Sequence, residues 1–177
     1  HAFAMIDYYY RKGGRVFDTA YIYNHGLSDK YLGDWINSRD LKDVVVLGKG
    51  AHTPDCLPDK IKPQIEESLS RGNIDKLDIY CLHRDNLDVP VTEFIDALNE
   101  CKNDGLIDML GASNWELERF KLANDYAEDQ EKESFKVLSN NFSLARMIEP
   151  VWPGCFSCDE SYLKYLKDNN IHLFPWS

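Results

Sequence analysis

The chain has 177 residues, of which 44% are apolar and 12% aromatic, and this composition excludes a disordered chain. Its formal net charge of -10 argues against nucleic acid or an anionic membrane surface as a partner. No apolar run approaches the roughly 20 residues of a membrane span, and we expect no signal peptide.

Apolar and polar residues alternate in blocks along the whole chain. Apolar positions at helical spacing predict a helix over residues 3–12, which Gly13 and Gly14 end. Beyond it, short apolar runs predict six strands, at residues 15–18, 44–49, 77–83, 107–112, 135–138 and 171–176. Amphipathic stretches predict five helices between them, one behind the N-cap Ser28 and the others around residues 61–69, 91–101, 117–127 and 162–166. Each strand and helix together take roughly 30 residues, which is typical of parallel sheets.

Two architectures fit this alternation, a doubly wound open sheet and an eight-stranded barrel. No G-x-G-x-x-G motif follows the first predicted strand, which disfavours a dinucleotide-binding doubly wound sheet. Polar residues stand at the carboxyl ends of nearly all the strands, where a barrel places its active site. We therefore predict an α/β fold, a (β/α)8 TIM barrel that is incomplete here. The chain would hold roughly strands 2 to 7, with the end strands missing.

Three neighbouring predicted strands each end in a titratable residue. These are Asp18, Lys49 and His83, and Tyr23 follows Asp18 by five residues. A phenol is a poor acid at neutral pH, but a nearby ammonium favours loss of its proton. A carboxylate would keep that ammonium charged, and a histidine could hydrogen-bond the reacting oxygen. The set suits proton donation to a carbonyl group while a hydride reaches its carbon.

Five cysteines are spread among these elements, which favours a reduced, cytoplasmic protein. Cys155 and Cys158 form a single C-x-x-C pair, and no second pair or pair of histidines stands at the spacing of a zinc site. We interpret the two as ordinary loop cysteines and predict no metal site.

Several short motifs occur in a fixed order around the titratable residues. They are Gly13-Gly14-Arg15-Val16-Phe17-Asp18-Thr19-Ala20, Leu32-Gly33, Glu67-Ser68-Leu69, Asp78-Ile79-Tyr80-Cys81-Leu82-His83, Gly105-Leu106-Ile107 and Gly111-Ala112-Ser113-Asn114. With Tyr23 and Lys49 between them, the sequence resembles the aldo-keto reductase family of NAD(P)H-dependent oxidoreductases, which are (β/α)8 barrels. The likeness in order and spacing runs through most of the chain.

The resemblance implies a catalytic tetrad of Tyr23, Asp18, Lys49 and His83, with Tyr23 as the proton donor. Tyr21 is the rival tyrosine, but its offset from Asp18 does not match the family's. Taken singly, Asp18 could be a turn acid, Lys49 a surface lysine and His83 a core histidine. Their joint placement at strand ends, in the family's order, favours catalysis over these structural roles.

The resemblance also implies a set of cofactor-binding residues. Ser113 and Asn114 match residues that hold the nicotinamide carboxamide, although the pair could also be a helix N-cap. Trp176 falls where the family has an aromatic residue stacked on the nicotinamide ring, although it could be a core residue. Ser139 stands where a glutamine is usual, and Asn140 is the substitute that we consider for it. The implied cofactor is NADP(H) rather than NAD(H).

We therefore expect residues 1–177 to form a single aldo-keto reductase barrel domain, truncated at both ends. The expected activity is reduction of an aldehyde or ketone to an alcohol, with a small carbonyl compound as the partner. One alternative is a non-catalytic, cofactor-binding or regulatory subunit. Another is an unrelated barrel hydrolase or isomerase that uses Asp18 and His83, which the lack of a paired carboxylate or metal triad disfavours.

Two further stretches carry expectations about the surface and the pocket. We interpret Arg84 and Asp85 as solvated charges. The segment Trp152-Pro153-Gly154-Cys155 is expected to help shape the substrate pocket.

Overall fold

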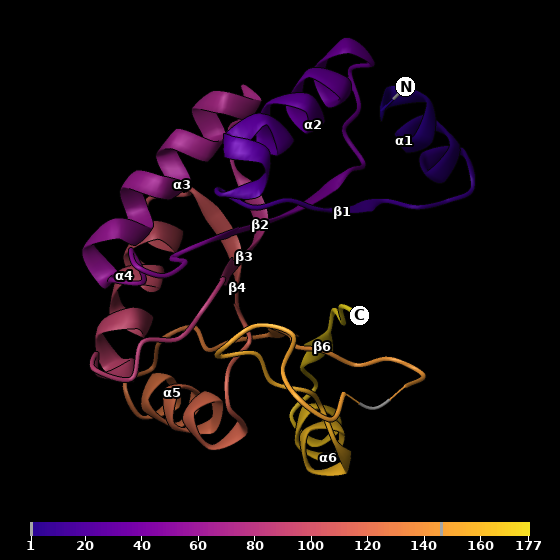
Figure 1. Cartoon of the computed structure of the whole chain (residues 1–177). Coiled ribbons are helices and arrows are strands. Elements are labelled where there is room, and N and C mark those ends of the chain that lie inside the picture. The colour runs from indigo at the N-terminus through magenta and orange to yellow at the C-terminus, as the bar shows by residue number, and fades with distance from the viewer. Residues whose placement is uncertain (1, 146) are drawn as a thin grey trace.

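The computed structural model describes residues 2–145 and 147–177, and its centre is a parallel sheet curved into a half-barrel (Figure 1). Within the described residues the sheet has six strands in the order β1-β2-β3-β4-β5-β6, so each strand pairs with its neighbours in the chain. The strands are β1 Val16–Asp18, β2 Val45–Gly50, β3 Leu77–Leu82, β4 Ile107–Ser113, β5 Val137–Ser139 and β6 His172–Leu173. This order confirms the predicted barrel class and its parallel sheet.

Helices connect successive strands and form an arc along the outer face of the sheet (Figure 1). The helices are α1 Ala2–Arg11, α2 Leu27–Ser38, α3 Pro58–Gly72, α4 Val91–Asn103, α5 Leu117–Asp129 and α6 Glu160–Asp168, with a short 3-10 helix η1 Tyr23–Gly26 before α2. Helices α2 to α5 pack against their neighbours in chain order, as helices do in a barrel. In the described part, none of these helices is long and apolar enough to cross a bilayer.

The sheet buries apolar side chains on both faces because successive residues of a strand point to opposite sides. On the outer face, Val46 and Tyr80 belong to the main core, which includes Ile65 and Phe94 of the helices. On the inner face, a second cluster comprises Leu47, Ile79, Cys81 and Val137. This two-sided burial explains why the strands are almost continuously apolar in the sequence.

The connection after β1 differs from the expectation that Ser28 caps a helix. The chain enters η1 directly, and α2 begins at Leu27, preceded by Gly26 with a φ of 83°. Ser28 therefore lies inside the helix, where its hydroxyl oxygen is 3.0 Å from Thr19 Oγ1. The predicted N-cap is wrong because α2 begins one residue before Ser28, with Gly26 at the N-cap position.

The last strand is shorter than predicted. β6 covers His172–Leu173, whereas the apolar run predicts a strand to residue 176. Pro175 has no N–H to donate to a neighbouring strand, which limits regular pairing here. Trp176 instead forms an isolated bridge with Asn141.

Candidate active site

A cavity of about 750 Å³ opens at the carboxyl ends of the strands. Asp18 ends β1, Lys49 lies in β2, and His83 directly follows β3. Ser113 and Ser139, which end β4 and β5, complete the row. Parallel strands end at one edge of their sheet, so residues up to 121 positions apart in the chain meet in one place.

The Lys49 ammonium forms an ion pair with the carboxylate of Asp18. Asp18 pairs with Leu47 in the sheet register, and Lys49 lies two residues further along β2, on the same inner face as Leu47. The lysine side chain is only 4% exposed, whereas that of Asp18 is 48% exposed. The ion pair offsets the cost of burying the ammonium, so Asp18 holds the Lys49 side chain in place in the wall of the cavity.

Tyr23 enters the cavity from η1 and lies beside this pair. The Lys49 ammonium is 5.1 Å from the centroid of the Tyr23 ring. The Tyr23 and His83 rings meet edge to face, with their centroids 5.6 Å apart. The four residues predicted to form the tetrad therefore line the same cavity.

Tyr21 is held away from the cavity. Its hydroxyl donates a hydrogen bond to Glu67 over 2.7 Å, and this bond raises the pKa of the phenol. The Arg71 guanidinium lies 4.3 Å from the centre of the Tyr21 ring and donates to the Tyr21 carbonyl oxygen over 2.9 Å. These contacts anchor the loop on α3 and leave Tyr23 as the tyrosine that reaches the cavity.

His83 is a buried, neutral imidazole. Burial, together with the positive charges of Lys49 and Arg84 and the nearby His52, lowers its pKa to about 3. The His52 and His83 ring centroids are 5.0 Å apart. His83 Nδ1 has no hydrogen-bond partner among the described residues. A neutral imidazole keeps one N–H, so it can donate a hydrogen bond to a carbonyl oxygen without carrying a charge itself.

Among the predicted cofactor-binding residues, Asn114 has a free polar atom. Asn114 adopts a left-handed backbone conformation with a φ of 61°, and its side-chain amide donates to the His83 carbonyl over 3.2 Å and to Ser113 Oγ over 3.0 Å. Ser113 Oγ in turn donates to the Ser139 carbonyl over 2.7 Å. Asn114 Oδ1 is buried without a partner in the part of the chain that is described. An amide N–H of a ligand such as nicotinamide would satisfy it.

Trp176 also lines the cavity, next to the loop that contains Trp152. The two indole rings have their centroids 6.2 Å apart and an interplanar angle of 48°. Trp152, Pro153 and Cys155 are lining residues as well, as expected for the segment that shapes the pocket. Trp176 is thus placed where a planar ligand ring could pack against it.

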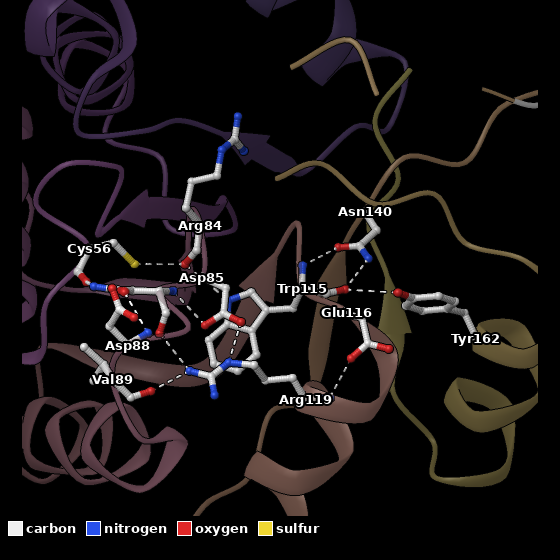
Figure 2. A network of polar contacts seen from close by, with 11 residues as sticks. Cys56, Arg84, Asp85, Asp88, Val89, Trp115, Glu116, Arg119, Asn140 and Tyr162 are labelled. Atoms are coloured by element: carbon white, nitrogen blue, oxygen red, sulfur yellow. Dashed lines mark hydrogen bonds and ion pairs between the residues drawn. The ribbon is translucent and has the colours of Figure 1, made fainter. Parts of the chain in front are cut away.

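Asn140 does not reach the cavity. Its Oδ1 accepts from the Trp115 backbone N–H over 3.1 Å, and its Nδ2 donates to the Trp115 carbonyl over 2.8 Å (Figure 2). Both ends of the amide are therefore occupied, and the residue is fully buried. These contacts join Asn140 to the backbone of the turn after β4, and Asn140 is not among the residues that line the cavity.

The interpretation of Asp85 as a solvated charge is wrong. Its carboxylate forms an ion pair with Arg119 over 2.5 Å, and the side chains of Arg119 and Asp85 are only 15% and 9% exposed (Figure 2). Burial raises the pKa of Asp85, and the hydrogen bond from Arg119 opposes that rise. Arg119 also donates to the carbonyls of Asn86 and Val89, over 2.9 and 2.6 Å. The pair ties the loop after β3 to α5.

Arg84 is half-buried and lines the cavity, which gives it a place in the site that the sequence did not indicate. Its carbonyl oxygen accepts from Cys56 Sγ and from Trp115 Nε1, both over 3.2 Å. Its side chain points away from the Arg119 network (Figure 2). His52, which follows Lys49 by three positions, is a second lining residue that was not predicted.

The C-x-x-C cysteines are free and buried. Burial raises the pKa of the Cys158 thiol to about 12, so it stays protonated at neutral pH. Among the described residues, no cluster of His, Cys, Asp or Glu is arranged to hold a metal ion.

Known proteins that are similar to this chain include reductases and dehydrogenases. A family model described as "Aldo/keto reductase family" matches residues 1–177. Norsolorinic acid reductase B of Dothistroma septosporum is 28% identical over 158 residues, which cover 81% of this chain and 40% of the relative. The probable aryl-alcohol dehydrogenase AAD4 of Saccharomyces cerevisiae is 25% identical, over 81% of this chain and 48% of the relative. The chain thus spans less than half the length of these two relatives.

Solved structures share the fold over nearly the whole chain. A glycerol dehydrogenase from Gluconobacter oxydans superposes with a TM-score of 0.78 at 21% identity, over 96% of this chain and 51% of the other. An aldo/keto reductase from Klebsiella pneumoniae, in complex with NADP and acetate, superposes with a TM-score of 0.68 at 25% identity, over 90% of this chain and 51% of the other.

Proposed function

Since this chain belongs to the aldo/keto reductase family, we propose that it carries the proton-donating site of an enzyme that reduces an aldehyde or ketone to an alcohol with NAD(P)H. Residues 1–177 would be one barrel domain that is incomplete at both ends. The observation that carries the proposal is the buried Lys49–Asp18 pair beside Tyr23 and His83 in one cavity.

In this proposal Tyr23 donates the proton to the carbonyl oxygen of the substrate. The Lys49 ammonium beside the ring stabilises the phenolate that remains, because opposite charges attract strongly at a partly buried site. Asp18 keeps Lys49 charged and fixes its position. Bound nicotinamide would supply the hydride.

His83 orients the carbonyl group in the same proposal. The His83 imidazole is neutral, so its N–H can donate a hydrogen bond to the substrate's carbonyl oxygen. Lys49 then remains the cation that stabilises the negative charge formed on Tyr23. The ring is held in place by its edge-to-face contacts with Tyr23 and His52. Its role would be to place the oxygen within reach of the phenol.

The cavity residues fit a nicotinamide cofactor. Asn114 Oδ1 offers an acceptor for the carboxamide N–H, and Trp176 offers an aromatic face. The hydrogen bond from the Ser113 hydroxyl to the Ser139 carbonyl oxygen holds this corner of the cavity together. We propose NADP(H) over NAD(H), because the K. pneumoniae relatives were solved with NADP and NADPH. The five free cysteines fit the reducing cytoplasm as the compartment.

The main rival is a regulatory subunit that binds cofactor without turnover. The complete set of Tyr23, Asp18, Lys49 and His83 favours an enzyme. A cofactor-oxidation assay with the full-length protein and a panel of aldehydes separates the two. We expect aldehyde-dependent loss of NADPH absorbance. Cofactor binding without turnover of any aldehyde would support the regulatory subunit.

A further inference from the structure

Arg84 places a positive charge in the cavity and is not one of the four residues proposed for the proton transfer. Arg84 is half-buried and lines the same cavity as Lys49 and His83. The charge of Lys49 is matched by Asp18, but no carboxylate pairs with Arg84 among the described residues. The adjacent acid, Asp85, is occupied by Arg119.

The backbone of Arg84 is fixed while much of its guanidinium remains available. Its carbonyl oxygen holds two donors, Cys56 Sγ and Trp115 Nε1. The Arg119–Asp85 pair anchors the following residues. The Arg84 side chain donates one hydrogen bond, from NH1 to the His83 carbonyl over 3.1 Å. A guanidinium has five N–H donors, so several remain for a ligand.

The surrounding charges favour an anion at this position. Asp18 is the one acidic side chain among the described lining residues, and it is paired with Lys49. The lining therefore carries a net positive charge inside a chain whose net charge is -10. His52, against the His83 ring, adds a second potential donor next to Arg84.

We propose that Arg84 binds a carboxylate of the substrate, so that the preferred substrates are aldehydes or ketones that also carry a carboxylate. The planar fork of a guanidinium matches a carboxylate in two parallel hydrogen bonds. Arg84 directly follows His83, which places the anion subsite next to the group that would orient the carbonyl. This inference rests on the proposed reductase function.

A matched pair of substrates tests the subsite in the full-length protein. The anionic member is 4-carboxybenzaldehyde, and the neutral member is methyl 4-formylbenzoate. The variants are Arg84→Gln and Arg84→Lys, with Arg11→Gln as the control because Arg11 is exposed, lies outside the cavity and has no carboxylate ion pair among the described residues. The readout is the ratio of kcat/KM for the acid to that for the ester.

We expect this ratio to fall by roughly ten- to a hundredfold in Arg84→Gln, as for loss of a charge-assisted hydrogen bond. Arg84→Lys should keep part of the preference, and Arg11→Gln should keep all of it. An equal ratio in the wild type and Arg84→Gln would overturn the proposal.

Calorimetric titration with benzoate and with benzamide measures binding at the subsite without turnover. It therefore distinguishes failure of this inference from failure of the proposed function. Both probes lack a reducible aldehyde. Turnover of aldehydes without an Arg84-dependent charge preference would overturn the carboxylate subsite alone. Tighter binding of benzoate than of benzamide, lost in Arg84→Gln, would support the subsite even if no aldehyde were reduced, and the absence of turnover would then overturn the reductase function.

Discussion

The Lys49 ammonium lies 5.1 Å from the centre of the Tyr23 ring, although the two residues are 26 positions apart in the chain. The parallel pairing of β1 with β2 brings them together, since Tyr21 N–H donates to the Lys49 carbonyl over 2.7 Å just ahead of η1. The proposed proton transfer depends on this arrangement, in which the Lys49 cation is fixed beside the Tyr23 phenol.

Replacing Lys49 with methionine should remove the charge and keep most of the apolar packing. We expect kcat for aldehyde reduction to fall by roughly 10²- to 10⁴-fold, the range for loss of assistance to a proton transfer. The affinity for NADPH, measured by fluorescence titration, should change little. Lys60→Met is the matched control, because Lys60 is exposed and lies outside the cavity. A Lys49→Met enzyme with wild-type kcat would remove the lysine from the mechanism.

His83 should make the protein less stable in mild acid. Its pKa is about 3 in the folded protein against an ordinary 6.5, so between these values the unfolded chain binds a proton that the folded chain does not. Stability therefore falls as the pH falls through this window, by ~1.4 kcal/mol per pH unit. The free energy of unfolding in urea should be measured at pH 7 and pH 5 for His83→Gln and the wild type. The decrease in this free energy from pH 7 to pH 5 should be ~2 kcal/mol smaller in His83→Gln than in the wild type.

The control for this experiment is His172→Gln, which removes an exposed histidine. This variant should show the same difference in unfolding free energy between pH 7 and pH 5 as the wild type. Equal acid sensitivity of His83→Gln and the wild type would mean that His83 is not the buried neutral group described.

Removing only one partner of the buried Arg119–Asp85 ion pair should strongly reduce the stability of the protein. Arg119→Met leaves the Asp85 carboxylate buried without its cation, which we expect to destabilise the protein by ~3 to 5 kcal/mol in urea unfolding. Replacing both residues, as Arg119→Met with Asp85→Asn, should recover part of that loss because no buried charge remains.

An exposed pair provides the comparison. Lys30 and Asp34 form an ion pair one helical turn apart in α2, with side chains 53% and 46% exposed. Lys30→Met should cost less than ~1 kcal/mol. Similar decreases in unfolding free energy for Lys30→Met and Arg119→Met would show that burial does not set the strength of the Arg119–Asp85 pair.

The parallel sheet and its strand ends could be predicted from the sequence because they depend on local patterns. Apolar runs that end in Asp18, Lys49 and His83 indicate where strands stop, and parallel order then brings those ends together. The choice of Tyr23 over Tyr21 came from the resemblance to the family, whose offset Tyr23 matches; Tyr23 lies in the cavity, whereas Tyr21 is anchored to Glu67.

Residues whose partners lie far away in the chain could not be assigned in this way. Asp85 resembles a surface acid until Arg119, 34 residues later, is seen to cover it. Asn140 resembles a ligand-binding amide, but the Trp115 backbone occupies both of its polar ends. In each case the deciding hydrogen bonds join segments that are distant in the chain, and no local pattern encodes them.

The most direct test of the central claim compares Tyr23→Phe with Tyr21→Phe in the full-length protein. Both variants lose one phenolic hydroxyl, but only Tyr23 lies in the cavity with Lys49 and His83. We predict that aldehyde reduction by Tyr23→Phe falls by at least ~10²-fold while the Kd for NADPH is unchanged, and that Tyr21→Phe stays within a few-fold of the wild type. Full turnover by Tyr23→Phe would contradict the account.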